Sequence, residues 1–197
     1  MPLFLHFFPP NSITWVSRSK LFLLCVFVLV GAASVQAQTV TQQTYKGTPH
    51  DEVQKSMMRR DWKNALWITE EYLQEQPRDP QMRFWRARLL EQLKRNDEAF
   101  DTYLELSREY PELAEVQNNL GVMLAAQGRM DEARQAFENA LRNNPDYAIA
   151  HENLGDILMH LAQRSYDKAI RLRGADKSLK QKTTALQPAL QLTLNPP

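Results

Sequence analysis

The sequence is poor in the residues that most catalytic sites need. Among its 197 residues it has one cysteine, Cys25, together with six glycines and four histidines. The glycines do not gather in one stretch, so the sequence contains no glycine-rich loop of the kind that cradles phosphate groups. No serine has a histidine and an acid in a pattern that indicates a nucleophile. These shortages argue against cysteine-based catalysis, nucleotide chemistry and serine hydrolysis.

The histidines are also badly spaced for a metal. His151 and His160 are nine residues apart and therefore point to opposite sides of a helix. His151 and Glu152 begin like the zinc-protease motif, but its second histidine would fall at Gly155. Glu152 and Asp156 share a helix face, and as a pair they suit contact with a cationic partner or plain exposure to solvent better than catalysis. We therefore predict no metal, no cofactor and no enzymatic activity.

An excess of charge of one sign is missing as well. The formal net charge is +1, with 24 cationic and 23 acidic side chains. A nearly neutral chain gives no support for nucleic acid or anionic lipid as the main partner. No feature indicates a small-molecule substrate, so a protein or peptide partner is the expectation that remains.

The N-terminal region differs from the rest of the chain. Residues 21–33 form an unbroken apolar run, preceded by Arg18 and Lys20 and followed by Val35-Gln36-Ala37, which has small or compact residues at the −3 and −1 positions of a possible cleavage site. This order predicts a secretory signal peptide over residues 1–37, with a polar linker over residues 38–46 and a periplasmic protein as the product. Retention in the inner membrane through residues 21–36 is the alternative, although a spanning helix needs about 20 apolar residues.

Beyond residue 46 the sequence repeats itself. Prolines recur at positions 77, 111 and 145, and alanines recur at positions 65, 99 and 133, each at an interval of 34 residues. A fixed period of this length is typical of stacked helical hairpins.

The best unit, residues 114–147, resembles the tetratricopeptide repeat (TPR). It contains Asn119-Leu120-Gly121 in the first helix, and the family's other motif positions hold Leu124, Ala133, Phe137, Ala140 and Pro145. The resemblance implies an all-α fold, a right-handed superhelical solenoid of TPR helix hairpins. We expect the TPR domain to cover residues 47–173, with repeats at residues 46–79, 80–113 and 114–147 and a truncated fourth repeat at residues 148–173.

The fourth unit matches the TPR motif at its start but departs from the 34-residue period afterwards. Asn153-Leu154-Gly155 repeats the motif, whereas Tyr166 and Ala169 arrive five residues before the corresponding aromatic and small residues. The deletion removes the turn, so we predict one long helix over residues 149–173 that caps the solenoid.

The last segment, residues 174–197, is rich in Gln, Thr and Pro. We expect a mostly disordered tail with a short helix near residues 177–186. The alternative interpretation of the tail is a docking segment formed by its spaced leucines.

In proteins similar to this one, the first helices of successive repeats line a concave groove that holds a partner. Carried over to this chain, the resemblance predicts these partner-binding residues: Phe84, Arg88, Asn118, Asn119, Val122, Glu152 and Asp156. The acidic residues make a carboxylate clamp doubtful and favour a mixed or partly basic peptide.

These observations favour a non-catalytic scaffold or adaptor in the bacterial periplasm that binds a partner protein or peptide. A co-chaperone that holds extended client segments and a self-associating structural subunit, hence a homo-oligomer, are the alternatives. The sequence does not name the partner.

Overall fold

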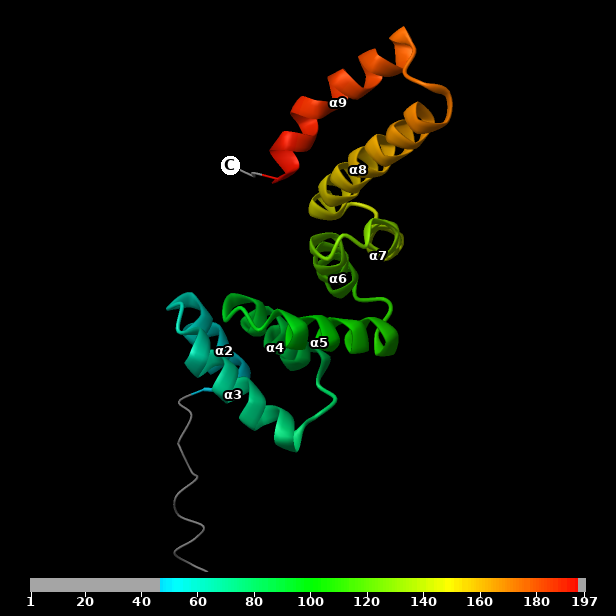
Figure 1. Ribbon diagram of the computed structural model, residues 1–197. Coiled ribbons are helices and arrows are strands. Elements are labelled where there is room, and N and C mark those ends of the chain that lie inside the picture. Colours follow the sequence, from blue (N-terminus) through cyan, green and yellow to red (C-terminus); the bar gives the residue numbers. More distant parts are fainter. Residues whose placement is uncertain (1–46, 195–197) are drawn as a thin grey trace, which may run out of the picture. The chain divides into compact units, whose positions relative to one another are not determined.

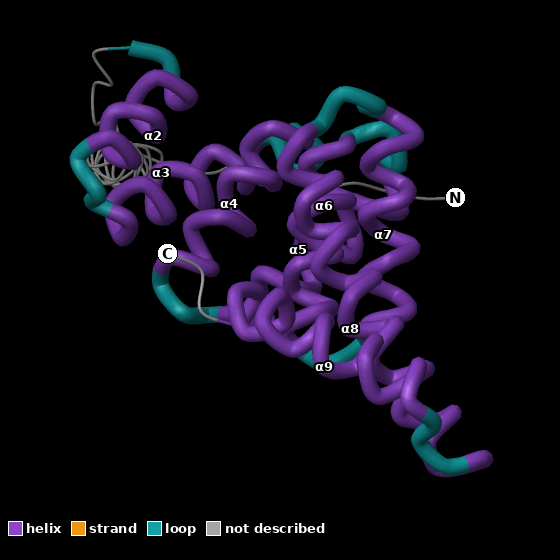
Figure 2. Tube along the Cα trace, turned by 90° about the horizontal axis from the view of Figure 1, so that it is seen from above, coloured by secondary structure: helices purple, strands orange, loops and turns teal. Residues whose placement is uncertain are grey.

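The computed structural model describes residues 47–194, and every element in that range is a helix (Figures 1 and 2). The predicted signal peptide and the predicted linker both lie outside the described residues. Residues Lys46–Pro197 form one compact unit that contains the whole described core. The helices are α2 (Pro49–Met58), α3 (Trp62–Glu75), α4 (Pro80–Gln92), α5 (Asn96–Glu109), α6 (Ala114–Ala126), α7 (Met130–Asn143), α8 (Ala148–Arg173) and α9 (Lys177–Leu194).

Three turns of the same design divide the first six helices into hairpins. Arg60, Lys94 and Gly128 have φ values of 56°, 62° and 75°, and they follow one another at the 34-residue period. In each turn this left-handed residue and the next one donate backbone hydrogen bonds into the preceding helix, as from Gly128 N to Ala125 O at 2.9 Å. The chain therefore reverses at the same place in each of the three repeats.

Small and aromatic side chains hold each hairpin together. Ala65, Ala99 and Ala133 are fully buried in the second helices, where a larger side chain would push the helices apart. Phe137 of α7 fills the space beside Gly121 of α6, where an added Cβ would lie 2.6 Å from the ring. Neighbouring helices pack in chain order, which places α4, α6 and α8 as the first helices of successive repeats (Figure 1).

The long terminal helix predicted over residues 149–173 is present as α8, Ala148–Arg173. The period that places turns at residues 60, 94 and 128 next falls on Ala162, which is helical in this structure. The fourth repeat therefore continues straight where the others reverse. Ala150 and Ile157 are its buried residues, and the helix packs against α7.

The expectation of a disordered tail over residues 174–197 does not hold for α9, Lys177–Leu194, which is longer than the short helix expected there. The local sequence gives little support for a helix here, and packing against α8 stabilises it instead. Leu179 and Leu190 become buried where α9 folds back along α8 (Figure 1). The residues of α9 that are at least partly buried, other than Ala189, follow a three–four spacing: Leu179, Thr183, Leu186, Leu190 and Thr193. Burial of this stripe stabilises α9 by more than Pro188 destabilises it. Pro188 lacks the N–H that donates the backbone hydrogen bond inside a helix.

Within residues 47–194, none of the helices combines the length and the apolar character needed to cross a bilayer.

Candidate functional site

The candidate site is the surface shared by α4, α6 and α8. The predicted residues occupy matching places on these helices, since Phe84, Asn118 and Glu152 follow the 34-residue period. Arg88, Val122 and Asp156 follow it one helical turn later. We call these six residues, together with Asn119, the inner-face set.

The structure separates the inner-face set by exposure. Val122 is 43% exposed, and Arg88 and Glu152 are exposed. Asn119 and Asp156 are half-buried. Phe84 and Asn118 are only 8% and 3% exposed, so they form the wall behind the surface more than the surface itself.

A cavity of about 240 Å³ lies between the start of α4 and the start of α6. Phe84 forms part of its wall, and the guanidinium of Arg88 lies 5.8 Å from the centre of the Phe84 ring. The remaining lining residues are Pro80, Gln81, Glu112, Leu113, Ala114, Glu115 and Val116. The cavity therefore has an apolar wall, the carboxylates of Glu112 and Glu115 at its edge, and the cation of Arg88 on the Phe84 ring, and it suits an apolar or aromatic side chain of a guest.

A second cavity of about 270 Å³ lies between α6 and α8. Val122, Asp156 and His160 line it, and Thr193 contributes from the end of α9. The hydroxyl of Thr193 lies 3.0 Å from Nε2 of His160, so α9 supplies part of the wall. The acidic group here suits a cationic side chain of a guest.

The two cavities open along one face of α6. Glu115 lines the first cavity, whereas Val122 and Ala126 line the second. Their spacing of seven and four residues keeps all three on one side of the helix. The site is therefore an extended strip with a pocket toward each end, which is the shape that an extended peptide requires.

A chain of hydrogen bonds ties the helices of the site together. Asn153 Nδ2 donates to Asn118 Oδ1 at 2.9 Å, and Asn118 Nδ2 donates to Asn119 Oδ1 at 3.2 Å. Asn119 Nδ2 donates to the hydroxyl of Tyr103 at 3.1 Å, and that hydroxyl donates to Glu91 Oε2 at 2.8 Å. We call this series, which joins α8, α6, α5 and α4, the polar chain.

The polar chain ends on a carboxylate in a poorly solvated place. Burial raises the pKa of Glu91 above its usual value, although the hydrogen bond from Tyr103 and the charge of Arg88 pull it down. Burial also raises the pKa of Tyr103 far above its usual range, with Glu91 adding to the effect. Tyr103 therefore stays protonated at every physiological pH and donates its hydrogen bond to Glu91. Each donor of the polar chain accordingly points from α8 toward Glu91.

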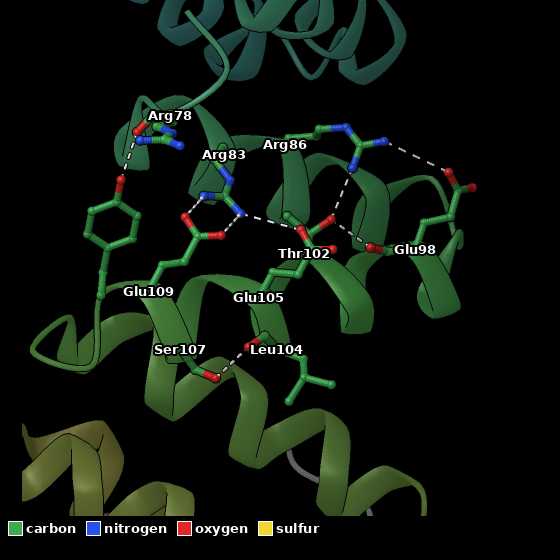
Figure 3. Close-up of polar contacts among 10 residues, drawn as sticks. Arg78, Arg83, Arg86, Glu98, Thr102, Leu104, Glu105, Ser107 and Glu109 are labelled. Carbon is green, nitrogen blue, oxygen red and sulfur yellow. Dashed lines mark hydrogen bonds and ion pairs between the residues drawn. The ribbon is translucent and has the colours of Figure 1, made fainter.

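A larger cavity, of about 590 Å³, lies elsewhere, among Pro77, Arg78, Arg83, Glu105, Glu109 and Tyr110. Figure 3 shows the guanidinium of Arg83 between two carboxylates, 2.6 Å from Glu109 and 3.3 Å from Glu105. Arg86 donates to the hydroxyl of Thr102 at 3.0 Å in the same view. These charges pair α4 with α5, so we assign this region to holding the hairpin together.

The sequence pattern missed part of the site. Glu91, Tyr103 and Asn153 belong to the polar chain, and His160 and Thr193 line the second cavity. His160 lies one helical turn beyond Asp156, which helical spacing alone could have indicated. Among the described residues no group of three or more His, Cys, Asp or Glu side chains is placed to hold a metal ion.

Comparison with solved structures finds the same fold at low sequence identity. The first TPR domain of Spaghetti (RPAP3), bound to the HSP90 peptide SRMEEVD, matches with a TM-score of 0.54 and 18% identity, over 58% of this chain and 90% of that one. The second TPR domain of human RPAP3, in complex with the HSP70 peptide SGPTIEEVD, matches with a TM-score of 0.51 and 16% identity, over 56% and 92%. PilF of Pseudomonas aeruginosa matches with a TM-score of 0.53 and 20% identity, over 73% of this chain and 68% of that one.

Comparison with curated protein sequences finds no match. The family model for the tetratricopeptide repeat matches three overlapping stretches, residues 60–114, 103–138 and 118–172. Together these stretches cover more than half of the chain and contain the helices that build the inner face. The chain therefore belongs to the tetratricopeptide repeat family, and its fold is an all-α, right-handed TPR solenoid that ends in a long helix.

Proposed function

We propose that this protein is a non-catalytic adaptor that binds an extended peptide segment of a partner protein along the inner face of α4, α6 and α8. The observation that carries the proposal is the continuous strip on α6 with one pocket toward each end. Two structural neighbours hold peptides, which supports this use of the fold.

The charges around the two pockets define the guest. Arg88 lies beside the Phe84 ring of the first pocket, which Glu112 and Glu115 also line, whereas Asp156 lines the other pocket and Glu152 lies one turn away from it. We propose a guest with an apolar or aromatic residue near a hydrogen-bond acceptor for Arg88 at one end and a Lys or Arg at the other. A short extended segment spans such a strip, since each of its residues adds about 3.3 Å.

The polar chain stabilises this strip before any guest arrives. Because Asn118 and Asn119 are already bonded to their neighbours, their side chains lose little freedom on binding. We propose that Asn119, which is half-buried, contacts the guest and that Asn118 acts from behind it.

The test is a peptide array screened against residues 46–197, followed by affinity measurements on the strongest binder by fluorescence anisotropy. We expect Arg88→Ala and Asp156→Ala each to weaken binding about tenfold, as loss of a charge-assisted contact of roughly 1.4 kcal/mol would do. Arg108→Ala is the matched control, because Arg108 is exposed on α5, away from the strip. Equal affinities for all three variants would contradict binding at the inner face.

We also propose a periplasmic location, supported by the cationic, apolar and small-residue order of residues 18–37. Cell fractionation with N-terminal sequencing tests it. A periplasmic chain beginning at Gln38 is the expected result, whereas an intact chain in the membrane fraction would favour retention through residues 21–36.

A further inference from the structure

One side of α8 receives no helix from the described residues 47–194, although the matching side of α6 receives α7. Gly121 and Gly155 hold the same place in the third and fourth repeats, each following Asn-Leu. A Cβ at Gly121 would meet the Phe137 ring at 2.6 Å, whereas a Cβ at Gly155 would meet nothing within 4 Å. The surface that receives α7 on α6 is therefore open on α8.

The open side includes three exposed residues, Gly155, Leu158 and Leu172, and three half-buried residues, Ala162, Tyr166 and Ala169. Helical spacing places one set of residues on it, which we call the open face: Gly155, Leu158, Ala162, Tyr166, Ala169 and Leu172. Leu158 is 48% exposed and Leu172 is 77% exposed. The hydrogen bonds between α9 and α8 are made at His160 and Gln163, which lie on a different side of α8 from Gly155.

The missing partner surface is present on the same helix, further along. Tyr166 and Ala169 are three residues apart, as are Phe137 and Ala140, which pack in the third repeat. In the third repeat the chain reverses at Gly128 and brings Phe137 back to Gly121. At the matching Ala162 the helix continues straight, so Tyr166 cannot reach Gly155 of its own chain.

We propose that the open face binds a second copy of this chain, with the two α8 helices antiparallel about a two-fold axis. The first half of each α8 then receives the second half of the partner's α8, and Gly155 faces the partner's Tyr166. Gly155 and Tyr166 are 11 residues apart, close to three helical turns, so both lie on the open face. This pairing places the axis between residues 160 and 161.

The symmetry of the open face favours a second copy over a different protein. The open face is self-complementary, since it presents a glycine and an aromatic residue at symmetric positions, as a two-fold interface requires.

Cysteine cross-linking tests the geometry. Residues 46–197 contain the whole described core and no cysteine, so one introduced cysteine reports on its own neighbours. Ala162→Cys places two cysteines about 4.5 Å apart along the paired helices, within disulfide reach. Leu172→Cys separates them by roughly 34 Å, although Leu172 is the more exposed residue. We expect a disulfide dimer from Ala162→Cys alone. No cross-link at residue 162, or equal cross-linking at both residues, would overturn the proposal.

Sedimentation equilibrium at tens of micromolar tests the association itself. We expect the unmodified unit to have twice the monomer mass, and Leu158→Glu to raise the dimer dissociation constant at least tenfold while circular dichroism stays unchanged. Leu192→Glu is the matched control, since Leu192 is 69% exposed on α9, outside the open face, and its dimer should persist.

Gly155→Leu gives a second variant in case Leu158→Glu disturbs folding. The Cβ at residue 155 meets nothing within 4 Å in its own chain, whereas the larger side chain blocks the close approach of a partner helix, so the dimer should again be lost. A monomeric unmodified unit, or a dimer that survives Gly155→Leu, would sink the proposal. Peptide binding at the inner face does not depend on either result.

Discussion

Helices α6 and α8 contain the same Asn-Leu-Gly sequence at the same place in the repeat, yet their surroundings differ. On α6 the glycine is covered by the Phe137 ring, and on α8 it faces open space. Both helices nevertheless join the polar chain through their asparagines. The Asn-Leu-Gly motif therefore forms a surface against which a second helix can pack closely. Whether the same repeat supplies that helix depends on whether a turn follows.

The largest effect should come from removing the aromatic residue of the covered hairpin. Phe137 is 1% exposed, and we expect Phe137→Ala to lower the free energy of unfolding by about 3–5 kcal/mol through lost burial and a cavity. Tyr166→Ala is the matched change on α8 and should cost less than about 1 kcal/mol in the monomer. Urea denaturation at low protein concentration measures both, and similar losses would abolish the contrast between the two regions.

The glycine of the covered hairpin should come next. In Gly121→Ala the new Cβ would lie 2.6 Å from Phe137, too close for any real contact, so the ring or the helix must move. Overpacking of this kind costs about 1–3 kcal/mol. A loss of stability in denaturant melts is expected, and an unchanged midpoint would show that α7 shifts freely.

Cutting the link between the two regions should have a moderate effect. Asn118 is 3% exposed and bonded to both Asn119 and Asn153. Asn118→Ala leaves Asn153 without its acceptor and should cost about 1–2 kcal/mol. Amide hydrogen exchange provides the readout, with faster exchange expected at the start of α8. Faster exchange at α3 instead would place the effect outside the polar chain.

Replacing Gly155 of α8 should raise the stability of the protein, in contrast to replacing Gly121. Gly155→Ala meets no atom within 4 Å and removes the flexibility of a glycine in a helix interior. We expect a gain of about 0.5–1 kcal/mol at concentrations where the monomer dominates. Thermal melts of the Gly121→Ala and Gly155→Ala variants side by side should shift in opposite directions.

The smallest effect concerns the exposed ion pair between α7 and α8. Arg164 donates to both carboxylate oxygens of Asp131 at 2.9 and 3.0 Å, which lowers the pKa of Asp131. An acid with a lowered folded-state pKa stabilises the fold above its unfolded value, here near 3.8, and this contribution is lost as the pH falls. Arg164→Ala should therefore destabilise slightly at pH 7, and the difference from the unmodified protein should disappear near pH 2. A difference that persists in acid would show that packing, not charge, is involved.

Much of the fold could be predicted because its determinants are local and periodic. The alanines and prolines at 34-residue intervals give the hairpins, and the five-residue deletion predicts that α8 continues past Ala162. Helix α9 could be predicted only in part. Its stability depends on burying Leu179 and Leu190 against α8, a contact between segments whose sequences show no shared period.

The site was harder to predict than the fold. Repeat positions indicate which side of a helix faces inward, but they do not tell how deep a side chain lies. Asn118 and Val122 are one turn apart and differ in exposure from 3% to 43%. Hydrogen bonds such as that from Tyr103 to Glu91 join residues 12 positions apart on different helices, and no spacing rule indicates them. That the inner-face set contacts a partner stays a prediction.

The straight passage of α8 through Ala162 also limits how this array can lengthen. A repeat protein grows by duplication because each added unit offers the following one the surface on which it stacked. The fourth unit breaks that succession, because α8 does not reverse at Ala162 and α9 packs along it in place of a second TPR helix. A repeat added after α8 would therefore meet a different surface from the one that the first three hairpins offer.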